Sequence, residues 1–300
     1  MKKFLVIGSK GFIGTHLSTH LENSGNEVWG ADVIVDYENT HHYHLIDASN
    51  PGFHEIFNNE SYDICINCSG AANVSDSLKH PYRDFQLNTS MVFNILEAIR
   101  TYQPECKFIN LSSAAVYGNP QSLPIKESSN LLPISPYGYH KLMSERICEE
   151  FHRFFGLKTC SLRIFSAYGE GLRKQLFWDL HHKAIHQNKI ELFGSGNESR
   201  DFIYIHDLIQ AILVVAHKAK CEGQSINVAN GEEIFIKDCV KTFYDLFEKS
   251  VEYEFSQQVK KGDPNNWVAD ISILKSLGYK QKYSLEEGLE NYYKWLRSIA

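Results

Sequence analysis

MKKFLVIGSKGFIG, residues Met1–Gly14, is the stretch of this chain that decides its fold. The apolar run Phe4–Ile7 ends at a turn rich in glycine, and a helical apolar pattern starts inside that turn, so the segment predicts strand, turn and helix. Gly8 would make the tight turn, Gly11 would let the backbone approach a pyrophosphate, and Gly14 would let the helix pack closely on the strand. Unpaired N–H groups at the helix start would face the anion. The segment therefore predicts a dinucleotide-binding turn.

The composition is that of an ordinary globular protein. The chain has 300 residues, of which 43% are hydrophobic and 22% charged, and its net charge is -6. That charge disfavours nucleic acid as a partner. The apolar run near the N-terminus is too short for a signal peptide, and no later stretch has membrane-spanning length. We therefore expect a cytoplasmic protein with no membrane partner.

Cysteine and histidine patterns predict neither disulfides nor a metal. The seven cysteines have no regular spacing. Cys65 and Cys68 fall in an apolar run and read as core thiols. The cluster His41–His44 has no carboxylate or cysteine at ligand spacing.

Asp32 closes the predicted second strand, Glu27–Asp32. A carboxylate about twenty residues past the glycine turn accepts hydrogen bonds from an adenosine ribose and repels a 2′-phosphate. Because no Lys or Arg follows it closely, the sequence favours NAD over NADP. The third strand is expected over His44–Asp47, where Asp47 and Ala48 would meet the adenine amino group.

The next elements continue the alternation of strand and helix. A fourth strand over Ile64–Cys68 opens into the small residues of Ser69–Ala72, where a backbone can pass close to a ligand. Helical periodicity covers Asp84–Arg100, and a fifth strand is expected over Lys107–Leu111. Strands alternating with helices at this spacing predict a parallel, doubly wound sheet.

Two residues at the head of a later helix carry the candidate chemistry. Tyr137 and Lys141 are four residues apart and share one helical face. An ammonium beside a phenol favours the phenolate, which lowers the pKa of the phenol and makes it a usable base. Ser113, at the end of the fifth strand, would hydrogen-bond the reacting oxygen. Tyr137, Lys141 and Ser113 are the predicted catalytic residues.

With these motifs in place, the chain resembles the extended short-chain dehydrogenase/reductases of the nucleotide-sugar epimerase and dehydratase family. The G-x-x-G-x-x-G spacing of the first turn is itself typical of short-chain dehydrogenases. The matching segments are Gly8–Gly14, Asp32, Asp47, Ser69–Ala72, Asn88, Ser112–Gly118, Tyr137–Lys141, Arg163–Gly169, Arg200–Phe202 with His206–Asp207, and Gly262–Pro264 with Asp270.

The resemblance implies an α/β fold with a Rossmann-type sheet and a smaller C-terminal α/β lobe. An NAD-binding domain is expected over 1–165, with 202–222 returning to it, and a nucleotide-sugar-binding lobe over 166–201 and 223–300. Relatives pair their helices around 84–100 and 137–155, which implies a homodimer. The implied cofactor contacts are Gly8, Gly11, Phe12, Ile13, Gly14, Asp32, Asp47, Ala48, Ser69, Gly70, Ala71, Asn88, Ser112, Tyr137, Lys141 and Phe165.

The resemblance also implies a nucleotide-sugar substrate. Phe193 is the candidate for stacking on the base, and Arg200 matches the family's diphosphate contact. Lys261 stands where relatives often carry a second Arg. Ser113 and Ser166 would contact the sugar, although the family usually has Asn at the latter position.

Three functions follow in decreasing order of support. A UDP-hexose 4-epimerase would pass through a transient 4-ketone, with the hydride held by NAD. Dehydration and decarboxylation are disfavoured because relatives with those activities carry acidic residues where this chain has Ala114 and Ala115. The alternative is an NAD(P)H-dependent reductase of a nucleotide-linked 4-keto-6-deoxy sugar, which the departure at Ser166 leaves open. A non-catalytic NAD-binding protein is the third.

Overall fold

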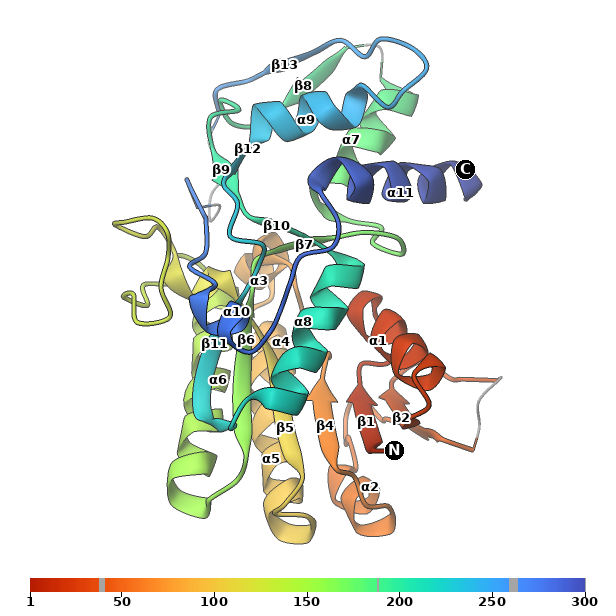
Figure 1. Ribbon diagram of the computed structural model, residues 1–300, viewed down its shortest axis with the longest axis vertical. Coiled ribbons are helices and arrows are strands. Elements are labelled where there is room, and N and C mark those ends of the chain that lie inside the picture. Colours follow the sequence, from red (N-terminus) through yellow and green to blue (C-terminus); the bar gives the residue numbers. More distant parts are fainter. Residues whose placement is uncertain (38–40, 188, 259–263, 300) are drawn as a thin grey trace.

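A parallel sheet forms the centre of the larger part of the molecule (Figure 1). The computed structural model describes residues 1–37, 41–187, 189–258 and 264–299. Seven strands run in the order β11-β6-β5-β4-β1-β2-β3, and every neighbouring pair is parallel. Their bounds are β1 Lys3–Ile7, β2 Glu27–Asp32, β3 Tyr43–Leu45, β4 Ile64–Asn67, β5 Lys107–Ser113, β6 Thr159–Ile164 and β11 Glu222–Val228. The predicted α/β doubly wound fold is confirmed.

Helices cover both faces of this sheet. One face carries α1 (Phe12–Asn23), α8 (Ile205–Lys218) and α10 (Ser272–Ser276). The other carries α2 (Phe53–Asn59), α5 (Met91–Tyr102) and α6 (Pro136–Phe155), with the short α3 (Val74–Lys79) and α4 (Pro81–Phe85) beside them. The two layers follow the alternation of side chains along a strand.

Strand β1 shows that alternation directly. Phe4 and Val6 join the hydrophobic cluster that includes Leu17 of α1. Leu5 joins the separate cluster on the opposite face, together with Ile95 of α5. All four residues of this strand's apolar run are buried, which is why it reads as a continuous apolar run rather than an alternating one.

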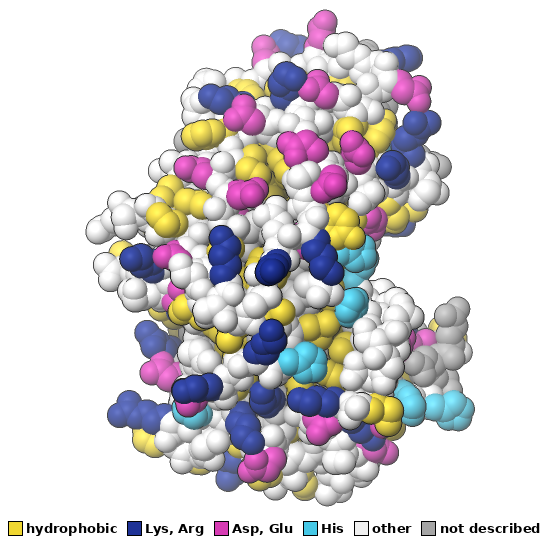
Figure 2. Space-filling model, viewed as in Figure 1, with side chains coloured by type: hydrophobic (Ala, Val, Ile, Leu, Met, Phe, Trp, Pro, Cys, Tyr) yellow, Lys and Arg dark blue, Asp and Glu magenta, His cyan; other side chains and the backbone are white. Residues whose placement is uncertain are grey.

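A smaller part follows β6 and sits at one end of the sheet (Figure 1). Its described residues form three two-stranded pairings and three helices. The pairs are β7 (Ser166–Tyr168) with β10 (Phe202–Tyr204), β9 (Ser199–Arg200) with β12 (Ile234–Phe235), and β8 (Ile190–Leu192) with β13 (Tyr253–Phe255); the helices are α7 (Gln175–His186), α9 (Ile236–Tyr244) and α11 (Leu285–Ser298). Figure 2 shows that acidic and basic side chains both occur across this face of the molecule.

Two expected boundaries differ from the structure. The segment returning to the sheet runs beyond 202–222, because strand β11 continues to Val228 and pairs with β6. The helix expected over Asp84–Arg100 is interrupted by a π-helical turn, Gln86–Ser90, between α4 and α5. A π-turn leaves the apolar periodicity readable, so the pattern alone predicts one helix. The division into a 1–165 domain and a lobe stays a prediction.

Other structural expectations meet the described residues as follows. All seven cysteines are free, with Cys68 half-buried and the others buried. Among the described residues, no group of three or more His, Cys, Asp or Glu side chains is arranged to hold a metal. Within the same ranges, none of the helices combines the length and apolar character that crossing a bilayer requires.

Gly14 tests the packing of α1 on the turn. A Cβ at this position would lie 2.0 Å from the carbonyl oxygen of Gly8, a backbone atom that cannot move aside. We expect Gly14→Ala to lower the free energy of unfolding by about 2–3 kcal/mol, measured by urea denaturation. Gly25→Ala is the control, because an added Cβ there meets nothing within 4 Å and only its positive φ costs about 1 kcal/mol. Equal losses in the two variants would contradict the close approach.

Candidate active site

The glycine turn presents bare backbone at the start of α1. The Gly11 N–H donates to the carbonyl of Gly8 at 3.0 Å, which closes the turn. Gly11 is also the N-cap of α1 and offers no side chain to the first N–H groups of the helix. The first turn, with Phe12 and Ile13, is therefore open to an anion, as the sequence predicts.

Asp32 is held beside this turn at the end of β2. Its carboxylate accepts hydrogen bonds from the backbone N–H of Lys10 at 2.9 Å and of Val33 at 2.7 Å. Asp47 and Ala48 follow β3 and are exposed, and the Asp47 carboxylate accepts from the backbone and hydroxyl of Ser49. These residues lie at the carboxyl edge of neighbouring strands β1, β2 and β3, where ligands bind in open α/β sheets.

Gly70, Asn88 and Lys141 enclose one space next to the end of β4. A Cβ on Gly70 would lie 2.5 Å from Asn88 Oδ1 and 3.4 Å from Lys141 Nζ, so only glycine fits there. Both side-chain polar atoms of Asn88 are buried with no hydrogen-bond partner among the described residues. Ser69 and Ala71 flank this glycine, and the Ser69 hydroxyl donates to Asn67 Oδ1 at 2.6 Å. The buried amide atoms of Asn88 without partners are what is expected where a polar cofactor supplies the missing hydrogen bonds.

The predicted catalytic residues lie together. Tyr137 and Lys141 are buried on one face of α6, and the Lys141 Nζ lies 6.0 Å from the centre of the Tyr137 ring. The ammonium donates to the Leu111 carbonyl of β5 at 2.9 Å. Ser113, two residues further along that strand, hydrogen-bonds to the Tyr137 side chain. The end of β5 and the first turn of α6 thus build the site.

Burial dominates the electrostatics of this pair. It raises the pKa of the Tyr137 phenol to about 12, and the hydrogen bond with Ser113 opposes the rise. It lowers the pKa of the Lys141 ammonium to about 8, against the effect of the Asp84 and Glu145 carboxylates. Burial thus raises the pKa of Tyr137 overall, and the expectation that Lys141 lowers the pKa from that level stays a prediction. Removing both groups from water favours their neutral forms.

Two residues that the sequence places at the cofactor point their side chains in other directions. The Ser112 hydroxyl donates to Glu145 Oε1 at 2.5 Å, on the face of β5 opposite to Ser113, as the alternation of strand side chains requires. The Phe165 ring packs 6.3 Å from the Tyr117 ring and 5.9 Å from that of Trp267. Neither side chain belongs to the cluster around Tyr137.

The expected substrate contacts come from several short elements of the smaller part. The Ser166 N–H donates to the Asp201 carbonyl, between β7 and the chain before β10. The Arg200 guanidinium lies 5.7 Å from the Trp267 ring and donates to the carbonyls of Ser199 and Asn265. Phe193 is 62% exposed at the end of β8, so its ring is available for stacking. Lys261 lies outside the described residues.

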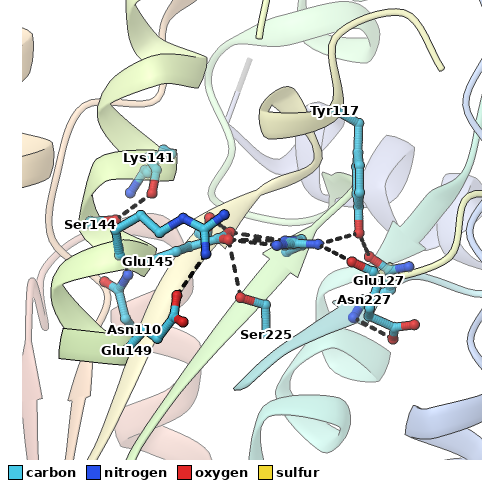
Figure 3. A network of polar contacts seen from close by, with 12 residues as sticks. Asn110, Tyr117, Glu127, Lys141, Ser144, Glu145, Glu149, Ser225 and Asn227 are labelled. Atoms are coloured by element: carbon cyan, nitrogen blue, oxygen red, sulfur yellow. Dashed lines mark hydrogen bonds and ion pairs between the residues drawn. The ribbon is translucent and has the colours of Figure 1, made fainter. Parts of the chain in front are cut away.

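A buried polar network behind the catalytic helix was missed by the sequence analysis (Figure 3). Arg163 of β6 binds both carboxylate oxygens of Glu145, with its Nη2 at 2.8 Å and its Nε at 3.1 Å. The Nη1 of Arg163 donates to the Tyr117 hydroxyl at 2.8 Å, and that hydroxyl donates to Asn227 Oδ1 at 2.7 Å. Asn227 in turn donates to the carbonyls of Ile125 and Asp270. The spacing of Glu145, four residues after Lys141 on the same face, was the available signal.

Comparison with known proteins then places the chain in a family. The model of the NAD dependent epimerase/dehydratase family matches residues 4–229. The chain belongs to this family. It is 30% identical over 317 residues to the uncharacterized UDP-glucose epimerase YtcB of Bacillus subtilis, covering 99% of this chain and 98% of that protein. The resemblance drawn from the sequence motifs is confirmed.

Solved structures of family members share the whole fold. The UDP-N-acetylglucosamine 4-epimerase of Methanobrevibacter ruminantium, in complex with UDP-N-acetylmuramic acid, is 27% identical with a TM-score of 0.90, covering 100% of this chain and 99% of that one. The UDP-glucuronic acid 4-epimerase of Bacillus cereus, in complex with UDP-glucuronic acid and NAD, is 28% identical with a TM-score of 0.90, covering 99% and 100%.

The ion pair of Glu145 and Arg163 gives a prediction for stability. Both side chains are about 5% exposed, so Glu145→Ala leaves a buried guanidinium without its carboxylate. We expect the free energy of unfolding to fall by about 3–5 kcal/mol in urea denaturation. Glu149→Ala, one turn further along α6, removes an exposed pair with Arg146 and should cost less than about 1 kcal/mol. A small loss for Glu145→Ala would show that the network does not stabilise the sheet.

Proposed function

We propose that this family member is an NAD-dependent nucleotide-sugar 4-epimerase of the UDP-hexose class. The observation that carries the proposal is the cluster of Ser113, Tyr137 and Lys141 at the carboxyl edge of the sheet, beside the open glycine turn. Ala114 and Ala115 follow the strand end and are buried, so the chain offers no acid or base there for eliminating a leaving group. The two family members whose solved structures are given above are UDP-sugar 4-epimerases, which supports the same reaction here.

NAD fits the residues at the cofactor edge of this sheet. The start of α1 would hold the pyrophosphate, Asp32 the ribose, and the space between Gly70 and Asn88 the nicotinamide end of the molecule. When bound, NAD supplies a hydride acceptor that becomes the hydride donor of the return step. The Asp32 carboxylate favours a ribose hydroxyl over a phosphate, so we propose NAD rather than NADP.

The residues of the chain carry the proton chemistry. Tyr137 as a phenolate takes the proton of the sugar 4-hydroxyl while the C4–H bond breaks, and the Ser113 hydroxyl donates a hydrogen bond to the same oxygen. The Lys141 ammonium stabilises the phenolate form of the base. After the ketone presents its other face, the same phenol returns its proton to the oxygen, so no proton or electron pair is lost over the cycle. Arg200 and the exposed Phe193 would hold the nucleoside diphosphate.

The first experiment is to denature the purified protein, assay the released nucleotide, and incubate native protein with UDP-glucose, UDP-galactose, their N-acetyl forms and UDP-glucuronic acid without added cofactor. We expect retained NAD and interconversion of one 4-epimer pair. Tyr137→Phe should lower turnover at least about 100-fold, since the base is lost, and leave NAD binding within a few fold. NADH or NADPH oxidation only with a 4-keto-6-deoxy nucleotide sugar would instead establish the reductase.

A homodimer through α5 and α6 is the second part of the proposal. These helices pack together and leave large apolar side chains in solvent. The exposed large apolar residues on them and on α4 are Tyr82, Phe85, Phe93, Tyr102, Tyr139, Met143, Phe154 and Phe155. Exposed apolar surface that gathers on neighbouring helices favours a protein–protein contact. Asn88 lies just before α5, and Tyr137 and Lys141 lie on α6. An interface on these helices would therefore also stabilise the position of the site residues.

Light scattering after gel filtration tests this interface. We expect twice the chain mass of 34.4 kDa for the wild type and a shift to the single-chain mass for Met143→Glu, because a buried carboxylate opposes pairing. Ile185→Glu changes an apolar residue on α7, outside these helices, that is 56% exposed against 43% for Met143, and this variant should remain a dimer. A single-chain mass for the wild type would rule the homodimer out.

A further inference from the structure

A histidine lies between the two catalytic residues of α6 and contacts a buried carboxylate. The Nδ1 of His140 is 2.6 Å from Oδ1 of Asp84, the residue before the last one of α4. The side chains are 12% and 3% exposed, respectively. His140 itself is fixed from a second side, because the Thr89 hydroxyl donates to its backbone carbonyl at 3.0 Å. The pair is therefore a defined, water-poor contact between α4 and the catalytic helix.

Among the described residues, no hydrogen bond explains why the second carboxylate oxygen of Asp84 is buried. Oδ2 is buried and has no hydrogen-bond partner among the described residues. Burying a carboxylate oxygen without a hydrogen-bond partner costs free energy, so a functional reason for its burial is expected. The negative charge reaches both catalytic groups, since it raises the pKa of the Tyr137 phenol and also raises the pKa of the Lys141 ammonium.

We propose that Asp84, held in place by His140, is the buried charge that sets the pH range in which Tyr137 and Lys141 work together. This inference rests on the proposed function for its activity assay, although the charge and its contacts do not depend on it. Asp84 acts here as a positioned charge and His140 as the residue that positions it. Neither is placed against the substrate.

The other ionisable groups near Tyr137 and Lys141 are either paired with an opposite charge or neutral. On α6 itself, Glu145 is matched by Arg163. From α3 and α4, Asp76 and Arg83 form an ion pair at 3.6 Å, and their side chains are 37% and 69% exposed. From the end of β4, burial raises the pKa of the Cys68 thiol to about 12, so it is neutral. From the π-turn, Thr89 contacts His140 and Asn88 lies next to Gly70, and neither side chain carries a charge.

The sign of the effect follows from the charge. Removing a negative charge near Tyr137 makes the phenolate easier to form, and removing it near Lys141 makes the ammonium easier to deprotonate. Both titrations therefore move to lower pH when Asp84 is neutralised. Tyr137 and Lys141 titrate as a coupled pair. Both limbs of the pH–activity profile therefore move to lower pH, whichever of the two proton losses controls each limb.

The experiment is the pH profile of epimerisation for the wild type, Asp84→Asn and Asp76→Asn. We expect the Asp84→Asn profile to shift to lower pH by about one unit on both sides, and the Asp76→Asn profile to match the wild type. Asp76→Asn is the matched control because it removes the same charge from a neighbouring helix where solvent screens it. A reduced maximum with an unshifted profile would make Asp84 merely structural and overturn the proposal.

Two His140 variants separate positioning from folding. His140→Asn keeps an N–H donor near the position of Nδ1 and should keep the wild-type profile. His140→Leu leaves the carboxylate with no partner, and an unpartnered buried carboxylate takes up a proton, so the profile should shift to lower pH as in Asp84→Asn. If the asparagine and leucine variants have the same profile, the histidine does not position the charge.

A spectroscopic titration tests the inference without any substrate. Phenolate absorbance at 295 nm is recorded for each protein as the difference from the same protein carrying Tyr137→Phe, which isolates this one phenol. We expect the Tyr137 phenolate to form at lower pH in Asp84→Asn than in the wild type, by about one unit. The same midpoint in both proteins would overturn the inference even if the epimerase activity is present. A shifted midpoint without epimerase activity would retain the inference and reject the proposed function.

Discussion

The buried pairing of Arg163 with Glu145 is the contact on which the arrangement of the site depends. Its carboxylate comes from the catalytic helix α6 and its guanidinium from strand β6, so the pair fixes how far that helix stands from the sheet. Through Tyr117 and Asn227 the same guanidinium is linked to the chain at Ile125 and Asp270, which approaches the smaller part of the molecule. A buried pair of this kind contributes little net stability over an apolar core, but it tolerates only one geometry. The position of Lys141 relative to Ser113 therefore depends on the geometry of this ion pair.

Removal of water is the second organising influence. The carboxyl edge of the sheet keeps Tyr137 and Lys141 dry, and in that setting each charge within reach counts for more than it would in solvent. Two carboxylates raise the pKa of Lys141: Glu145, which is paired with Arg163, and Asp84, which contacts His140. The strength of Tyr137 as the proposed base therefore depends on several neighbouring side chains and not on the tyrosine alone.

The sequence predicted the first five strands of the sheet and the motif residues because both depend on local patterns. The glycine turn, the apolar runs and the four-residue spacing of Tyr137 and Lys141 are visible within short windows, and the structure brings these residues to one edge. What sequence reasoning missed depends on long-range contacts. Ser112 and Ser113 are neighbours with similar chemistry, and only the pleat of β5 decides which one meets the phenol. Asp84 reads as an ordinary helical carboxylate until its pairing with His140, 56 positions away, is known. The roles of Phe193 and Arg200 stay predictions.

The π-turn at Gln86–Ser90 has a consequence for how this helix can change in evolution. A π-turn is one residue more than a regular helix needs over the same rise. Losing that residue would restore a uniform helix and rotate everything on one side of it by about 100° relative to the other. Asp84 precedes the π-turn and Asn88 lies within it, so the two residues could then no longer face α6 and Gly70 at once. Single-residue deletions here should be far rarer among functional homologues than substitutions, because the spare residue maintains the phase between two parts of the site.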